Sequence, residues 1–335
     1  MIKLENVYPL RLKNEFYTGK TMSSITNNTA LYSLENLITN HQRLECSCHY
    51  RLNLNTPSHF ATFPCNVTDF TGEPFKVWQC PKRQIIHALD VVYFNYYYAI
   101  YPVLDATRTW SYRIIYQKLH QRFIKHGFSK NYSLLDYGCA ANALFLQYLE
   151  QKGFTNYYGY DPYGSPETLA NSTVLQQKPF NYIWLQNVIK YVDDLNALLS
   201  QLNPLLAPGG YIIVGTLNAA NITLTPFEVS AHYNPIHSSY PLHLYTPKSL
   251  ESLGCRQGWE AAEFLDGLYY NLPFLLNSRA WNEYQRLLNG PLKVVLEPIQ
   301  TWKALTSSYK DMFYALFVYW LSFKIDMTLM FRKSF

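Results

Sequence analysis

Short apolar runs alternate with longer amphipathic segments between about residues 130 and 265. The runs "SLLDYG", "NYYGYD", "NYIWLQN", "YIIVGTL" and "WEAAEFL" have the length and composition of strands, several of them fully buried. Segments with helical spacing lie between them, at 143–152, about 192–206 and 246–258. Strands that alternate with helices predict parallel β-α-β units. The expected fold is therefore α/β, with an open sheet covered by helices on both faces.

The flanking segments have different patterns. Polar residues dominate the first 45 positions, cysteines and turn residues dominate 46–85, and aromatic residues are dense from 86 until a helical pattern starts at 110. Beyond 266 the pattern is mainly helical, and apolar residues at helical spacing predict a last helix over 310–331. We therefore expect three parts: an N-terminal extension at 1–115, an α/β domain at 116–266 and a helical C-terminal extension at 267–335.

Composition narrows the classes of partner. Of the 335 residues, 48% are hydrophobic, and 30 are tyrosines, which suit a binding surface as well as a core. The net charge is only +5 and basic residues do not form runs, so nucleic acid is not an expected partner. The most membrane-like stretch, 312–323, has 12 uncharged residues, whereas about 20 span a bilayer. The start has no apolar signal region, so the cytoplasm is the expected compartment. Burial on the sheet domain, a dimer contact or a protein partner would each explain the C-terminal helix.

Two acidic residues follow neighbouring strands. Asp136 and Gly138 end the first strand, and Asp161 ends the second, 23 residues after Gly138. In open parallel sheets, ligands bind beyond the carboxyl ends of the strands. An acid at the position of Asp161 can accept both hydroxyls of a ribose. The alternative is a strand-end aspartate that caps the next helix.

The order of these segments carries a family resemblance. "LLDYGC", "YYGYDPY", "FNYIWLQNVIKYVDD", "LNPLLAPGGYIIVGTLN" and "HLYTPKSLESLGCRQGWE" together resemble class I S-adenosylmethionine-dependent methyltransferases, over about 130–265. "YYYAIYP", "DYGC", "GYDPY", "GTLNA" and "HSSYPLHLYTPKSL" are similar to a bacterial subgroup with a cysteine-rich, zinc-ribbon-like extension ahead of a Rossmann-like domain. The resemblance implies S-adenosylmethionine as cofactor. It also implies a cofactor site that is made of Asp136, Gly138, Ala140, Asn142, Asp161, Gln186 and Asn187.

The chain departs from the family pattern at three places. The family turn Gly-Cys-Gly-x-Gly is replaced by "GCAANA" at 138–143, where Asn142 can adopt a left-handed backbone but alanine would push a ligand outward. Lys190 and Tyr191 stand where the family often has Glu-His, and Asn181 stands where an acid is expected. These departures leave an alternative function open, a methyltransferase-like binding or scaffold protein without catalysis. A second alternative is an RNA methyltransferase with a zinc module.

The loop "HSSYPLH" supplies candidate bases. His237, Tyr240 and His243 lie within seven residues, and the subgroup resemblance places this loop over the pocket. Histidine titrates near neutral pH and can take a proton from a hydroxyl or amine acceptor. We expect the acceptor to be a small molecule or a glycan-type compound.

Four cysteines could form a metal site. Cys46, Cys48, Cys65 and Cys80 offer the four sulfur ligands of a structural zinc. The second cysteine pair is incomplete, because Arg83 stands where a cysteine would complete a C-x-x-C motif with Cys80. A nearby histidine could replace one ligand, and a ribbon without metal is the other interpretation.

Overall fold

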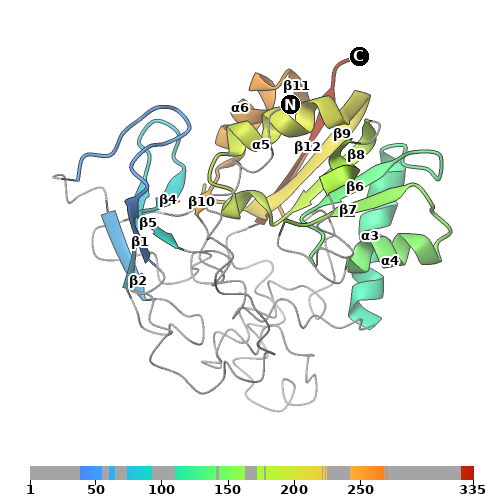
Figure 1. Ribbon diagram of the computed structural model, residues 1–335, viewed down its shortest axis with the longest axis horizontal. Helices are drawn as coiled ribbons and strands as arrows, with labels where there is room; N and C mark the ends of the chain where they lie inside the picture. The colour runs from blue at the N-terminus through green and yellow to red at the C-terminus, as the bar shows by residue number, and fades with distance from the viewer. Residues whose placement is uncertain are drawn as a thin grey trace, which may run out of the picture.

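Figure 1 shows the computed structural model, which describes residues 38–54, 60–64, 74–92, 110–140, 143–162, 172–176, 179–220, 222, 224, 242–267, 269 and 326–335. Its centre is a six-stranded sheet in the order β11-β12-β9-β8-β6-β7. The strands are β6 (Leu134–Tyr137), β7 (Tyr157–Tyr160), β8 (Phe180–Gln186), β9 (Leu206–Leu217), β11 (Trp259–Leu265) and β12 (Asp326–Lys333). The pairs β7–β6, β6–β8 and β8–β9 are parallel, and β12 is antiparallel to both neighbours. The predicted α/β fold is confirmed.

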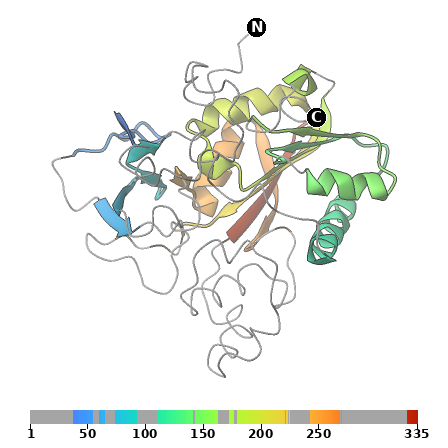
Figure 2. The ribbon, with the colours of Figure 1, turned by 60° about the horizontal axis from the view of Figure 1, so that its bottom comes forward.

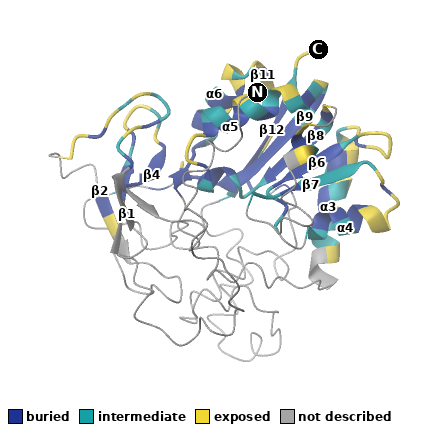
Figure 3. Cartoon of the chain, viewed as in Figure 1, coloured by how far each residue is buried: buried dark blue, intermediate teal, exposed yellow. Residues whose placement is uncertain are grey.

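Helices cover both faces of this sheet. They are α3 (Trp110–Lys125), α4 (Leu144–Gln151), α5 (Leu195–Leu202) and α6 (Pro247–Arg256), with short 3-10 turns η7 (Ser172–Gln176), η8 (Ile189–Tyr191) and η9 (Asn203–Leu205). Leu135 and Ile183 belong to the apolar cluster that contains α5 and α6, whereas their neighbours Leu134 and Tyr182 belong to the cluster that contains α3 and α4. Successive strand residues point to opposite faces, so both sides are buried, as the dark blue strands of Figure 3 show.

Helix α6 illustrates how the sequence fixes an element boundary. Thr246 Oγ1 accepts a hydrogen bond from the Ser249 N–H at 3.2 Å, and Ser249 Oγ accepts one from the Thr246 N–H at 2.9 Å. Pro247 follows the cap, where its missing N–H is not needed. This capping box contributes about 1 kcal/mol and begins the helix that the sequence predicts at 246–258.

The cysteine-containing segment forms a second, smaller sheet. Its order is β10-β4-β3-β2, from β2 (Phe60–Pro64), β3 (Pro74–Gln79), β4 (Ile86–Ala88) and β10 (His243–Leu244), while β1 (Ile38–Gln42) pairs with β5 (Asp90–Val92). Strand β10 comes from the chain between β9 and α6, so it ties the small sheet to the large one. Arg43 Nε also donates to Asp193 Oδ1 at 2.9 Å across this junction.

The C-terminal prediction was wrong in its last part. Residues 326–331 were assigned to a helix, but they belong to β12, the red strand that lies within the sheet in Figure 2. The strand inserts between β9 and β11, and Met327, Leu329, Met330 and Phe331 are all buried there. A short continuous apolar run has no period that separates a buried strand from a buried helix. The rest of the predicted helix, 310–325, lies outside the described residues.

No helix within the described residues is both long enough and apolar enough to cross a membrane.

Candidate functional site

The large sheet has a point at which strand order reverses. From β6 the chain moves to β7 on one side and then returns to β8 on the other side (Figure 1). The connections that leave the carboxyl ends of β6 and β8 run in opposite directions there, and such switch points are where ligands bind in open α/β sheets. Gly138, Asp161, Gln186 and Asn187 lie within one or two residues of the ends of β6, β7 and β8.

The turn after β6 has a glycine-type backbone although only one glycine remains. Gly138 has φ +84°, and a Cβ there would lie 2.3 Å from Val188 Cγ2, so no larger residue fits without movement. Ala140 and Ala143 have φ +56° and +40°, in the left-handed region that alanine adopts at a cost of about 1 kcal/mol. The alanines therefore keep the path of a glycine turn. Asn142 and Ala141 lie outside the described residues.

Asp161 is bonded to this turn. The N–H of Ala140 donates to Asp161 Oδ2 at 2.8 Å, and the N–H of Gly138 donates to the Tyr160 carbonyl at 2.7 Å. Asp161 is thus positioned by the backbone of the neighbouring turn and does not stand alone at a strand end. The two segments that the sequence predicts to share a ligand are brought together here.

Asp136 lies beneath the turn and is only 4% exposed. Burial, and to a smaller extent the negative charge of Asp161, raise the pKa of Asp136 to about 8. A carboxyl group in this state holds its proton near neutral pH. A cationic group placed beside it would favour the carboxylate, so the position suits a ligand ammonium.

Gln186 contributes an amide without a described partner. Its side-chain nitrogen and oxygen are both buried and have no hydrogen bond among the residues that the structure describes. The amide lies against Gly215, where a Cβ would be 2.2 Å from Gln186 Oε1. Buried amides are normally hydrogen-bonded, so this group is available to a bound molecule. Asn187 next to it has φ +59° and donates its N–H to the Gly215 carbonyl at 2.8 Å.

Lys190 follows these residues on η8 and is 6% exposed. Burial lowers the pKa of Lys190 to about 8, while the charge of Asp326 acts in the opposite direction. Its Nζ lies 4.9 Å from the centre of the Tyr191 ring. A lysine in this state is partly neutral just above neutral pH and can accept a proton. The Lys190–Asp326 pair could not be found from the sequence, because Asp326 is 136 positions away and was expected in a helix.

The side chain of the predicted base His243 is engaged within the small sheet. It is on β10, 4% exposed, with Nδ1 2.8 Å from His87 Nδ1 and Nε2 3.1 Å from the Asp193 carbonyl. Burial lowers the pKa of His243 to about 3, helped by the charge of Arg43. Both ring nitrogens are thus engaged at the junction of the two sheets, which disfavours proton removal from a substrate. His237 and Tyr240 lie outside the described residues.

Three of the four predicted metal ligands are brought together. The Sγ atoms of Cys46, Cys48 and Cys80 all lie within 4.8 Å of one another, and those of Cys48 and Cys80 are 3.5 Å apart. Cys65 lies outside the described residues. Arg83, at the position of the missing cysteine, donates to Ser252 Oγ at 2.9 Å and so contacts α6 instead.

Comparison with known proteins gives one family. Residues 109–263 match the model of a family described as a methyltransferase domain, which includes every strand of the switch point. No curated protein matches the sequence.

Several solved structures are similar to part of this chain, three of which are as follows. Phosphoethanolamine N-methyltransferase 2 from Haemonchus contortus is 13% identical, with a TM-score of 0.46 over 74% of this chain and 62% of that one. A putative sarcosine dimethylglycine methyltransferase from Galdieria sulphuraria is 13% identical, with a TM-score of 0.39 over 65% and 85%. An S-adenosylmethionine-dependent methyltransferase from Mesorhizobium loti is 11% identical, with a TM-score of 0.38 over 64% and 98%. The chain thus spans less than two thirds of the length of the first of these.

Proposed function

We propose that this chain, whose residues 109–263 match a family described as a methyltransferase domain, binds S-adenosylmethionine at the switch point of its sheet and methylates a small-molecule acceptor. The observation that carries the proposal is the pairing of Asp161 with the turn after β6. This bond brings an acidic strand end and a left-handed turn to one place, above the buried Asp136. The boundaries 116–266 remain our proposal for the catalytic domain.

The described residues are chemically suited to this cofactor. Asp136 would face the ammonium of the methionine part, and Asp161, at the end of β7, would accept the ribose hydroxyls. The Gln186 amide, which has no partner among the described residues, would be satisfied by the ligand, beside Asn187. When bound, the cofactor supplies a methyl group on a positively charged sulfur. The chain's part is to hold the acceptor in line and to remove its proton where needed.

We assign the proton transfer to Lys190, with His237 and Tyr240 as the other candidates. Lys190 is two residues beyond Val188, whose side chain contacts Gly138 of the turn. Its pKa of about 8 lies near the range in which a general base works well, whereas the pKa of about 3 makes His243 a weak base. An amine or hydroxyl acceptor would give up its proton to this lysine. Assays with glycans and with other small molecules would identify the class of acceptor.

We also propose structural zinc at Cys46, Cys48 and Cys80, with Cys65 as the fourth ligand. A tetrahedral site with zinc–sulfur bonds of about 2.3 Å separates its sulfurs by about 3.8 Å. The three described sulfurs lie within 4.8 Å of one another, and two of them are 3.5 Å apart, which is near this spacing. Two of these cysteines are buried, which favours a structural role over a catalytic one.

Titration of the purified chain with S-adenosylhomocysteine tests the cofactor assignment. We expect micromolar affinity, about −8 kcal/mol. Asp161→Ala should weaken it by about 1–3 kcal/mol. The control Glu260→Ala, which removes an exposed carboxylate on β11, should leave it unchanged. Absence of binding at millimolar ligand would refute the proposal and favour a methyltransferase-like binding protein, in which the alanines of the turn mark lost catalysis.

A further inference from the structure

A basic cavity lies outside the switch-point site, between α3 and Tyr269. We propose that it binds a small ligand through a phosphate group. The cavity has a volume of about 240 Å³ and is lined by Lys118, Gln121, Arg122, Lys125 and Tyr269. None of these residues has a role in the cofactor site, so the proposal stands independently of methyl transfer.

The helix side of the cavity is a polar stripe. Lys118, Gln121, Arg122 and Lys125 recur at i, i+3, i+4 and i+7, which places their side chains on one face of α3. The neighbouring positions Leu119 and Phe123 are fully buried against the sheet. The core therefore fixes the rotation of α3, and this rotation presents three cationic side chains to the same space.

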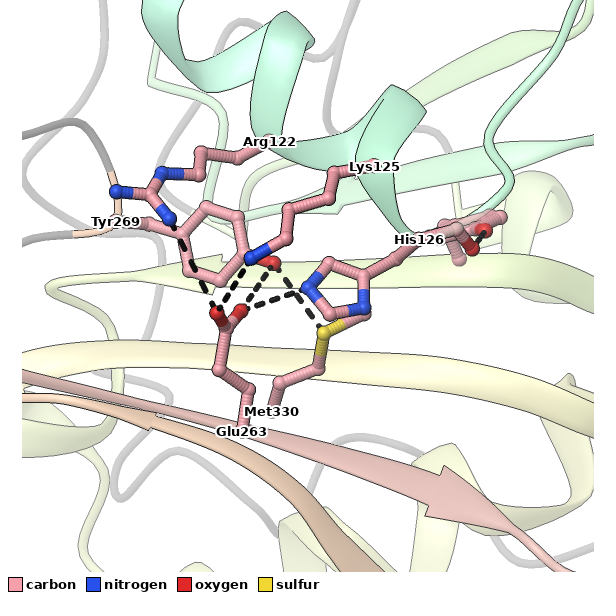
Figure 4. Close-up of polar contacts among 7 residues, drawn as sticks. Arg122, Lys125, His126, Glu263, Tyr269 and Met330 are labelled. Atoms are coloured by element: carbon pink, nitrogen blue, oxygen red, sulfur yellow. Dashed lines mark hydrogen bonds and ion pairs between the residues drawn. The ribbon is translucent and has the colours of Figure 1, made fainter.

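Glu263 lies below Arg122 and Lys125 in Figure 4. Its Oε1 lies 4.0 Å from an Arg122 Nη atom and 3.9 Å from Lys125 Nζ. These separations exceed the about 2.7–2.9 Å of a charge-assisted hydrogen bond. The cations are attracted to Glu263 without giving up their N–H donors, which remain available to a ligand.

The other oxygen of Glu263 is already used. Oε2 lies 2.7 Å from His126 Nε2 and accepts a hydrogen bond from the Tyr269 hydroxyl at 3.3 Å. Tyr269 is fully buried, and its hydroxyl also lies 3.2 Å from Met330 Sδ, so its ring forms a fixed wall. Among the described residues, Glu263 is the carboxylate that Arg122 and Lys125 meet. The described residues at the cavity thus carry one negative charge, on Glu263, and three positive charges, on Lys118, Arg122 and Lys125.

Charge and size together select the class of ligand. The excess of about two positive charges matches a phosphate dianion, which can take the planar fork of Arg122 and the ammonium groups of the lysines at once. The volume of about 240 Å³ is below the about 300–1,000 Å³ of sites for drug-sized molecules. A small phosphate ester or pyrophosphate is therefore favoured over a nucleotide cofactor.

Calorimetric titration of the full chain with inorganic phosphate and with inorganic pyrophosphate tests the site. We expect both to bind, and Arg122→Gln to weaken each at least about tenfold. Lys125→Gln, at a largely exposed position, should weaken each severalfold without any effect on folding. The matched control is Arg113→Gln on the same helix, because nine residues at 3.6 per turn place Arg113 opposite Arg122. It should change affinity less than about twofold.

Two results would overturn the proposal. One is the absence of binding of either anion at about 10 mM. The other is an equal loss of affinity in the Arg113 and Arg122 variants, which would show only general attraction to a basic chain. Binding of S-adenosylhomocysteine should be the same in all three variants, so failure here leaves the cofactor assignment untouched.

Discussion

Replacing Asp136 by Asn should make the free energy of unfolding less dependent on pH. Asp136 is 4% exposed, and burial together with the charge of Asp161 raises its pKa to about 8. In the unfolded chain the same group has a pKa of about 3.9. Between these two values the folded protein holds a proton on Asp136 that the unfolded chain has lost.

The sign follows from this difference in bound protons. The contribution of protonated Asp136 to stability is fully present below about pH 4 and is lost as the pH rises through about 8. The slope is at most about 1.4 kcal/mol per pH unit, since one pKa unit corresponds to that free energy. From about pH 5 to about pH 7 the natural chain should therefore lose up to about 2.7 kcal/mol relative to Asp136→Asn, which cannot ionise.

Urea unfolding at three pH values across this range measures the effect. The comparison is between the natural chain, Asp136→Asn and the control Glu260→Gln, whose carboxylate is exposed on β11. The free energy of unfolding of the control should depend on pH as that of the natural chain does. Parallel pH dependence of the natural chain and Asp136→Asn, within about 0.5 kcal/mol, would show that Asp136 ionises normally and would refute the argument.

The same residue links pH to ligand binding. If Asp136 meets the ammonium of the cofactor, binding must displace its proton below about pH 8. Affinity for S-adenosylhomocysteine should then rise by up to about tenfold per pH unit between pH 6 and 8. Asp136→Asn should bind more weakly and without this dependence. A flat profile in the natural chain would place the ammonium elsewhere.

Three further substitutions test the turn and the cysteine cluster. Gly138→Ala should destabilise the fold by at least about 2 kcal/mol in thermal unfolding, because its Cβ would lie 2.3 Å from Val188 Cγ2 at φ +84°; an unchanged melting temperature would contradict this. Ala140→Gly should stabilise the fold by about 1 kcal/mol, because glycine adopts the left-handed backbone without strain. The control Ala197→Gly in α5 should destabilise the fold by a similar amount. If both variants were destabilised equally, the turn would not be strained. Cys80→Ser should lower the zinc content and the melting temperature, while Cys255→Ser, at an exposed position on α6, should retain both; metal retained in the Cys80 variant would refute the site.

The sequence by itself determined the local elements of the α/β core. The sequence predicts strands β6, β7, β8 and β9 because burial on two faces selects continuous apolar runs. It also contains the cap of α6, because a capping box uses residues that are neighbours in the chain. The positions of Gly138 and Asp161 at strand ends followed from the same pattern. Their meeting at one edge follows from parallel pairing.

Only the tertiary structure decided which distant residues meet. The chain's last apolar run forms β12 because it is buried and hydrogen-bonded between β9 and β11 in the sheet. His243 was drawn into the small sheet by pairing with β4, and Lys190 met Asp326 from the opposite end of the sequence. The basic cavity beside α3 likewise depends on Glu263 and Tyr269, which are far from α3 in the sequence. Periodicity reports which face of an element is buried, but contacts between distant elements depend on the free energy of the whole fold, which no local pattern contains.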